Sequence, residues 1–229
     1  MLEPWLMGNE VITPKNFFEE NSPYYEYGAF IGIDEYIDLY KANQFDCGNL
    51  NSSWNATREY IEKALEVIGR DKDDEDYELD NEEKYMILNS IGKPPLCSYN
   101  IYFITIYNET EEKVVYIGKT DSRKSRFSNG HRASLKLHNP IYNNYNKRVY
   151  FATVMFLDKD KEYLPLEYIT PLDEAKKILG YTESILIRYF QPELNTQMVN
   201  NDEIAIKTVF HIQNFTNTVP FLNDIFISI

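Results

Sequence analysis

Two apolar runs joined by a short polar loop constrain the fold of this chain more than any other feature of its sequence. The runs YNIYFITIY (residues 99–107) and KVVYIG (residues 113–118) are rich in tyrosine, isoleucine and valine, and the five polar residues NETEE separate them. Such residues favour β-strands, and a loop of this length favours an antiparallel hairpin. A third strand-like run, KRVYFATVMFL (residues 147–157), follows later in the chain. The sequence therefore predicts a small three-stranded antiparallel sheet.

The hairpin also predicts which side chains share a face of the sheet. If Tyr107 pairs with Lys113 across the loop, Tyr102 lies opposite Gly118. Because side chains alternate between the two faces of a strand, Tyr102 and Tyr116 then point to the same face. Tyrosines on one sheet face are most often part of a hydrophobic core, so they gain a functional interpretation only together with other residues.

Helical patterns surround the predicted sheet. Apolar residues recur at helical spacing, with polar capping residues before them and glycine or proline after them. The predicted helices are residues 32–42, 51–69, 82–92, 171–181 and 182–190. In the last of these, Thr182 is the expected N-cap, so that Glu183 would open the helix. The apolar tail after residue 200 fits a strand and a helix equally well.

The expected fold class is α+β, with a small three-stranded antiparallel sheet flanked by helices and preceded by a mainly helical acidic segment. Pro94-Pro95 separates the helical pattern from the strand pattern and is the expected boundary. We therefore expect an acidic, mainly helical segment over residues 1–95 and a sheet domain over residues 96–200. Residues 201–229 would form a C-terminal extension that packs on this domain.

Charge is distributed very unevenly along the chain, whose formal net charge is −13. Residues 1–97 hold 21 acidic against 8 basic residues, whereas residues 98–229 hold 15 of each. Within residues 113–148 there are nine lysines and arginines against Asp121 alone. A basic stretch in an acidic protein favours contact with a polyanion such as DNA, although a solvated helix face explains the charge equally well.

Membrane and zinc functions are disfavoured by the sequence. No apolar run approaches the roughly 18 residues that cross a bilayer, and no basic segment followed by an apolar one marks a signal peptide. Cys47 and Cys97 are far apart and the three histidines are scattered, so the spacing of zinc ligands is missing. We expect a cytoplasmic protein with reduced thiols and no membrane partner.

Several dispersed residues gain meaning from their order along the chain. They are Tyr102, the run Tyr116-Ile117-Gly118 followed by Lys119-Thr120, Arg126, His131, Glu183, the pair Leu186-Ile187, Pro192 and Asn195. In this order and spacing they resemble the GIY-YIG nuclease family over residues 98–196. Two features depart from the family pattern. The first signature, Asn100-Ile101-Tyr102, lacks its leading glycine, and His131 follows Arg126 by five positions, one more than is common.

The resemblance implies hydrolysis of phosphodiester bonds in DNA with one divalent cation, Mg²⁺ or Mn²⁺, per active site. Glu183 would be the metal ligand, since a carboxylate supplies the hard oxygen that Mg²⁺ prefers. Arg126 would hold the scissile phosphate through two parallel hydrogen bonds and stabilise the charge of the transition state. Asn195 would hold the site together by hydrogen bonding.

Two residues compete for the role of general base. Tyr102 is the preferred activator of the attacking water, provided that nearby cations such as Lys119 or the metal favour its phenolate form, and Tyr116 would align Tyr102 or the water. An unperturbed imidazole titrates at about pH 6.5, which makes His131 the rival base or else a phosphate contact. The cations expected to contact the DNA backbone are Lys119, Arg123, Lys124 and Arg132.

The first functional interpretation is therefore a metal-dependent DNA endonuclease, a hydrolase, in a setting of restriction or antiviral defence. A second is a nucleic-acid-binding or structure-specific accessory protein that uses the fold with weak or no cleavage. A third is a nuclease module regulated by a protein partner that binds the acidic segment of residues 1–95. Because one active site cuts one strand, cleavage of both strands would need a homodimer or two successive nicks.

Overall fold

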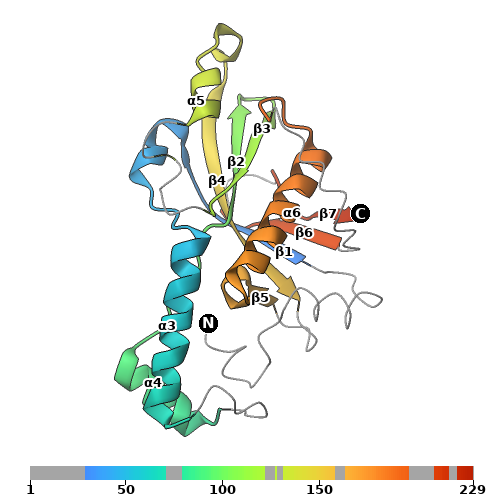
Figure 1. The fold of residues 1–229 in the computed structure, drawn as a ribbon. Helices are drawn as coiled ribbons and strands as arrows, with labels where there is room; N and C mark the ends of the chain where they lie inside the picture. The colour runs from blue at the N-terminus through green and yellow to red at the C-terminus, as the bar shows by residue number, and fades with distance from the viewer. Residues whose placement is uncertain are drawn as a thin grey trace.

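A single twisted β-sheet organises the chain (Figure 1). The computed structural model describes residues 29–70, 79–121, 127, 131–157, 163–195, 209–216 and 221–228. Within these ranges the strands are β1 (Ala29–Asp38), β2 (Ile101–Tyr107), β3 (Glu112–Lys119), β4 (Asn146–Leu157), β5 (Tyr163–Pro165), β6 (Val209–Asn214) and β7 (Ile225–Ser228). These seven described strands form one mixed sheet in the order β3-β2-β4-β1-β6-β7, and β5 pairs with β4.

The predicted three-stranded sheet is wrong, because β3, β2 and β4 are only one part of this larger sheet. Strand β1 continues it by pairing antiparallel with β4 and parallel with β6. The predicted helix over residues 32–42 is wrong for the same reason, since most of this segment belongs to β1. Ala29, Ile31 and Ile33 are fully buried in the sheet core. Hydrogen bonding along both edges of β1 overrides the helical pattern of its sequence.

The predicted hairpin of β2 and β3 is confirmed, and its register is as predicted in the half that contains Tyr102 and Gly118. Tyr102 pairs with Gly118, as expected, whereas Tyr107 pairs with Glu112 and not with Lys113. A bulge after Ile104 absorbs the difference of one residue. Strand β4 then pairs with the other edge of β2, and this pairing is antiparallel as predicted for the third strand.

Helices make up most of the remaining described structure. Their bounds are α3 (Leu50–Ile68), α4 (Asn81–Ile91), α5 (Arg132–Lys136) and α6 (Leu172–Phe190), with the 3₁₀ turns η1 (Leu39–Gln44), η2 (Pro140–Tyr142) and η3 (Leu166–Tyr168). The helices predicted over residues 51–69 and 82–92 are confirmed as α3 and α4. The side chain of Asn49 caps α3, and Gly69 ends it with φ of 69°. None of the described helices is long and apolar enough to cross a membrane.

The two helices predicted after residue 170 are one continuous helix, α6. Thr182 is therefore not an N-cap, and its hydroxyl instead donates to the Ile178 carbonyl one turn earlier, at 2.9 Å. Glu183 consequently lies in the body of the helix and not at its start. The glycine at position 180 looks like a break in the sequence, but it is accommodated within α6.

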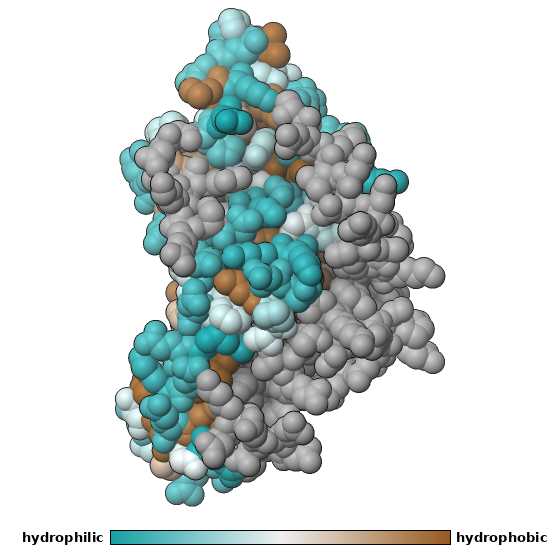
Figure 2. Space-filling view, in the orientation of Figure 1, coloured by the Kyte–Doolittle hydropathy of each residue, from teal (hydrophilic) through white to brown (hydrophobic). Residues whose placement is uncertain are grey.

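Two hydrophobic cores lie on the two faces of the sheet. Helix α6 and η3 pack on one face, where Phe103 and Leu179 belong to the same buried cluster. The other face buries Tyr102 and Phe151 together with residues of α5 and of the turn after η1. On the face of the molecule that Figure 2 shows, the described residues are largely hydrophilic.

Strands from all three predicted sequence ranges contribute to the one sheet. The C-terminal tail, for which the sequence left strand and helix open, forms β6 and β7 in its described part. Strand β6 lies directly beside β1 from the acidic N-terminal range. The division into residues 1–95, 96–200 and 201–229 remains a prediction.

Candidate active site

A buried tyrosine–histidine pair joins Tyr102 of β2 to His131 at the start of α5. The Tyr102 hydroxyl is 2.8 Å from His131 Nε2, and both side chains are buried. His131 is also the N-cap of α5, where its Nδ1 accepts from the Ala133 backbone N–H at 3.2 Å. Because Nδ1 is thus an acceptor, the neutral imidazole carries its proton on Nε2 and donates it to the Tyr102 oxygen.

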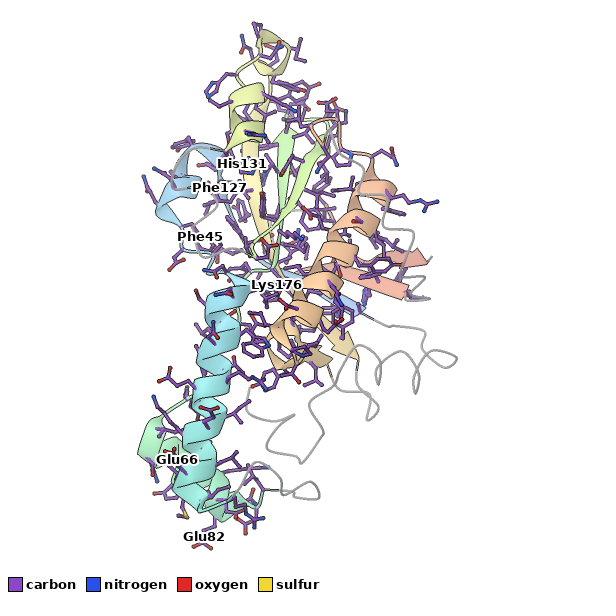
Figure 3. All side chains as sticks on the ribbon, in the orientation of Figure 1. Phe45, Glu66, Glu82, Phe127, His131 and Lys176 are labelled. Atoms are coloured by element: carbon purple, nitrogen blue, oxygen red, sulfur yellow. The ribbon has the colours of Figure 1, made fainter. Side chains whose placement is uncertain are left out.

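Aromatic rings enclose this pair. Tyr116 lies 5.0 Å from the His131 ring and 6.1 Å from the Tyr102 ring, measured between centroids. Phe127 stacks on the His131 ring with 5.2 Å between the centroids, and Figure 3 labels both residues close to each other below α5. Tyr116 is only half-buried, so it is the tyrosine of this group that reaches the surface. Sequence reasoning missed Phe127, and its position next to Arg126 gave no signal of a contact with His131.

Gly118 is required by the close approach of Tyr102. A Cβ on Gly118 would overlap the Tyr102 hydroxyl and would lie 2.9 Å from its Cε1. Tyr102 is fully buried and its ring cannot move aside without opening the core. The glycine of the Tyr-Ile-Gly run therefore makes room for the tyrosine hydroxyl on the neighbouring strand.

A second group, of charged side chains, lies beside the next residue of β3. Lys119 Nζ is 3.9 Å from Glu183 Oε2 on α6 and 3.3 Å from Asp121 Oδ2. All three side chains are partly buried, and Glu183 is 15% exposed. The separation from Glu183 exceeds a hydrogen bond, so Lys119 acts on it through charge. A Cβ on Gly180 would lie 3.2 Å from Lys119 Nζ, so the glycine in α6 lets the lysine pass.

The two groups meet at consecutive residues of one strand end but on opposite faces. Gly118 faces Tyr102, whereas Lys119 faces α6, because successive residues of a strand alternate. The structure therefore brings Tyr102, Tyr116 and His131 together, and separately brings Lys119 and Glu183 together. The two groups remain distinct within the described part of the chain.

Asn195 fastens the end of α6 to the exposed edge of β3. Its Oδ1 accepts from the Ile117 N–H, and its Nδ2 donates to the Ile117 carbonyl, both at 2.9 Å. The Leu194 N–H donates to the Val115 carbonyl at 3.0 Å. One asparagine side chain thus supplies both partners that a neighbouring strand would supply, and it holds in place the residue between Tyr116 and Gly118.

The neighbouring Glu193 secures the same turn from the other side. It accepts from the Tyr142 hydroxyl at 2.8 Å and pairs with Lys113 at 3.2 Å. Burial alone would raise the pKa of Glu193, but the Tyr142 hydrogen bond and the Lys113 charge together bring this pKa below its ordinary value. Burial and the adjacent Glu193 raise the pKa of Tyr142 to about 12, so its hydroxyl stays a donor.

The predicted DNA contacts are only partly covered by the described residues. Arg132 is exposed on α5. Lys119 is partly buried between two carboxylates, which suits a positioning role better than a contact with a distant phosphate. Arg123, Lys124 and the predicted phosphate ligand Arg126 lie outside the described residues.

The donor set at Glu183 fits a hard cation that keeps most of its water. Among the described residues there is no cluster of three or more metal-ligating side chains. Glu183 offers one carboxylate, with Asp121 on the other side of Lys119. Mg²⁺ is often held by one or two carboxylates and completes its shell with water and substrate phosphate, which matches this arrangement.

Comparisons of the chain with protein-family models, with curated proteins and with solved structures returned no match. The residues and contacts above are therefore the basis on which a function is inferred.

Proposed function

We propose that the protein is a metal-dependent phosphodiesterase that cuts DNA. The observation that carries the proposal is that two chemically active groups flank the end of β3, one on each face of the strand. The Tyr102–His131 pair lies against Gly118, and Glu183 lies beside Lys119. A tyrosine–histidine pair, a carboxylate and a lysine are the residue types that phosphate hydrolysis needs for water positioning, cation binding and charge stabilisation.

Glu183 is the residue that would hold the metal. Without a metal ion, the ammonium group of Lys119 balances the negative charge of Glu183. A bound Mg²⁺ or Mn²⁺ would polarise a phosphate oxygen and reduce the charge on the leaving group. Lys119 also keeps the Glu183 carboxylate at the end of β3, through a charge contact across 3.9 Å. In this proposal Arg126, in the segment after β3, holds the scissile phosphate.

The geometry of the aromatic group favours Tyr116 for positioning the attacking water. Tyr102 is fully buried, whereas Tyr116 is half-buried beside it. The hydrogen bond from His131 Nε2 stabilises the Tyr102 oxygen, and this donor role is incompatible with His131 acting as a base at the same atom. Tyr102 and His131 are then positioning residues that fix Tyr116 and the end of β3.

DNA is the proposed substrate because basic residues gather between positions 113 and 148 of an otherwise acidic chain. Exposed Arg132 belongs to this set. Restriction of foreign DNA or antiviral defence is the biological setting that we propose for such an activity, and it is supported by the resemblance of the motifs alone.

Replacing Glu183 with Gln tests the proposal. The substitution keeps the size of the side chain and removes its charge, so nicking of supercoiled plasmid in Mg²⁺ or Mn²⁺ should be lost. Binding to duplex DNA should persist, since the basic residues are unchanged. The melting temperature should change little, because both residues are good helix formers in the body of α6.

Glu174→Gln on the same helix is the matched control, since Glu174 pairs only locally with Lys177. This variant should nick plasmid at the wild-type rate. Wild-type activity in Glu183→Gln would show that Glu183 does not hold the metal and would contradict the proposed site.

A DNA-binding protein without cleavage is the second candidate function. Two observations favour it: Tyr102 is fully buried, and Glu183 is already partnered by Lys119. This candidate predicts that the wild-type protein binds duplex or branched DNA but leaves plasmid intact with either metal. Regulation through a protein partner of the acidic N-terminal range is compatible with both candidates.

A further inference from the structure

A short projection at one end of the molecule carries two large apolar side chains in solvent. The projection consists of residues 131–145, which include α5 and η2 and are called the tip below. Figure 1 shows α5 and the turn after it extending beyond the ends of β2 and β3. Leu135 is 70% exposed and Ile141 is 68% exposed. Figure 2 shows brown apolar surface at this end, surrounded by teal.

The tip is firmly seated although its apolar side chains point outward. Ala133, Leu137 and Tyr142 are buried in the core that also contains Tyr102. The Tyr142 hydroxyl donates to Glu193 at 2.8 Å, and Lys147 Nζ donates to the Tyr142 carbonyl at 2.7 Å. Leu135 and Ile141 are therefore held on a rigid base, and their outward position adds nothing to the packing of the core.

The tip's own side chains are cationic and rich in amides, while Glu193 and Glu111 contact its base through Tyr142 and Tyr145. Residues 131–148 contain no aspartate or glutamate, in a chain whose net charge is −13. The exposed polar side chains of the tip are Arg132, Lys136, His138, Asn139, Asn143 and Asn144. Two exposed apolar side chains on a basic, asparagine-rich surface complement a polyanion that also offers apolar stacking surfaces.

Duplex DNA has this chemistry, and we propose that the tip is a wedge that enters the DNA minor groove. Leucine and isoleucine inserted between base pairs unstack them and bend the duplex, while arginine, lysine and asparagine contact the groove and its phosphates. Leu135 and Ile141 are the inserted pair, and Arg132 and Lys136 are the flanking cations. The inference rests on the proposed function and deepens it by stating how the substrate is gripped.

The location of the tip relative to the candidate site supports this role. His131 is both the N-cap of α5 and the partner of Tyr102, so the tip begins within the site. The tip extends from there toward the start of β3, where the Tyr145 hydroxyl donates to Glu111 at 3.0 Å, so a duplex unstacked at Leu135 and Ile141 would be distorted along the path toward Gly118. Distortion makes a phosphodiester easier to place in line with a water molecule.

The charge of the tip disfavours a second copy of this chain or a typical protein partner. Two copies meeting at Arg132 and Lys136 would bring like charges together, because the acids in contact with the tip, Glu111 and Glu193, lie at its base and are bound there by Tyr145 and Tyr142. The pair Leu135 and Ile141 also offers little apolar area compared with a stable protein interface.

The test compares apolar and truncated versions of the wedge in the full-length protein. The probe is a short duplex with an A·T-rich centre that contains 2-aminopurine and carries a donor and an acceptor dye at its ends. Wild-type protein should raise the 2-aminopurine fluorescence through unstacking and raise energy transfer through bending. Leu135→Ala/Ile141→Ala should lose most of both signals with an unchanged melting temperature, because both side chains are exposed.

Two controls make the test specific. Leu135→Met/Ile141→Met keeps an apolar wedge and should restore both signals. Leu96→Ala removes an 89% exposed leucine outside the tip and should behave as wild type. Wild-type signals in the double alanine variant would overturn the wedge. So would a wild-type dimer that the double alanine variant dissociates while the DNA signals stay unchanged.

The outcomes also separate the wedge from the proposed function. If the wild-type protein nicks plasmid but leaves the probe straight and stacked, the wedge is wrong and the nuclease stands. If it neither binds the probe nor nicks plasmid in either metal, the proposed function and the wedge both fail.

Discussion

At the scale of single residues, Gly118 shows how one missing side chain shapes the candidate site. The sequence indicated that a glycine ends the strand, but the reason for it lies on the neighbouring strand. Tyr102 can be fully buried with its hydroxyl at His131 only because position 118 carries no Cβ. The pairing of Tyr102 with Gly118 was predictable from strand geometry, whereas the partner of the Tyr102 hydroxyl was not. His131 lies 29 positions away, and no local pattern reports such a contact.

Replacing Gly118 with Ala should therefore destabilise the protein. The added methyl group overlaps a buried, rigid ring, and overpacking of this kind costs about 1–3 kcal/mol. In a chain of this size, each kcal/mol lowers the melting temperature by roughly 2–4 °C. Thermal unfolding followed by circular dichroism measures the change.

Gly180→Ala is the matched control, and it should stabilise the protein where Gly118→Ala destabilises it. Its Cβ would meet only the flexible end of Lys119, while alanine favours helix over glycine by about 0.5–1 kcal/mol. A Gly118→Ala protein as stable as the wild type would show that Tyr102 is not confined as described.

At the scale of elements, the end of α6 and the edge of β3 act as one unit. Asn195 was predicted to hold the site together, and its two hydrogen bonds to Ile117 are of the expected kind. The continuity of α6 was not predictable in the same way, because Gly180 and Thr182 are typical of a helix end and a helix start. Packing of the whole helix on the sheet decides in favour of continuity, since Leu179 and Leu186 are both fully buried.

Asn195→Asp should loosen this unit. The substitution keeps the oxygen that accepts from the Ile117 N–H but places a second oxygen against the Ile117 carbonyl, where Nδ2 now donates. An unsatisfied or repelled buried acceptor costs about 1–3 kcal/mol. Hydrogen exchange should therefore become faster at Ile117, and the melting temperature should fall. Asn143→Asp on the exposed tip is the control, and an equal fall in both variants would mean that charge alone is responsible.

At the scale of the whole molecule, distant segments build the sheet that supports the site. The local hairpin of β2 and β3 was predictable because its strands are adjacent in the sequence. The position of strand β1 was not predictable, because its partners β4 and β6 lie far along the chain. Helix α3 is tied to the same body, because the Ser53 hydroxyl donates to the buried Glu167 carboxylate at 2.7 Å. The acidic N-terminal range thus contributes β1 and α3 to the folded body of the protein.

The salt dependence of DNA binding should show whether the basic residues between positions 113 and 148 contact phosphates. Neutralising Arg123, Lys124 and Arg132 together should flatten the slope of log affinity against log salt concentration by up to about 0.9 per lost phosphate contact. Fluorescence anisotropy with a labelled duplex at several salt concentrations measures this slope.

Lysines that pair within their own segments provide the matched control for this measurement. Lys41, Lys63 and Lys177 each bind a neighbouring acid, and their joint replacement should leave the slope unchanged. If the first triple variant keeps the wild-type slope, its three cations form only a solvated surface.

The position of β1 between β4 and β6 has a consequence for how the protein is made. Residues 29–33 leave the ribosome well before their parallel partner, residues 210–214, is synthesised. At roughly 5–20 residues per second, one edge of β1 waits for many seconds before it is covered. An uncovered strand edge is a template for pairing with other chains, so a nascent chain stalled before residue 209 should be prone to aggregate and to require a chaperone.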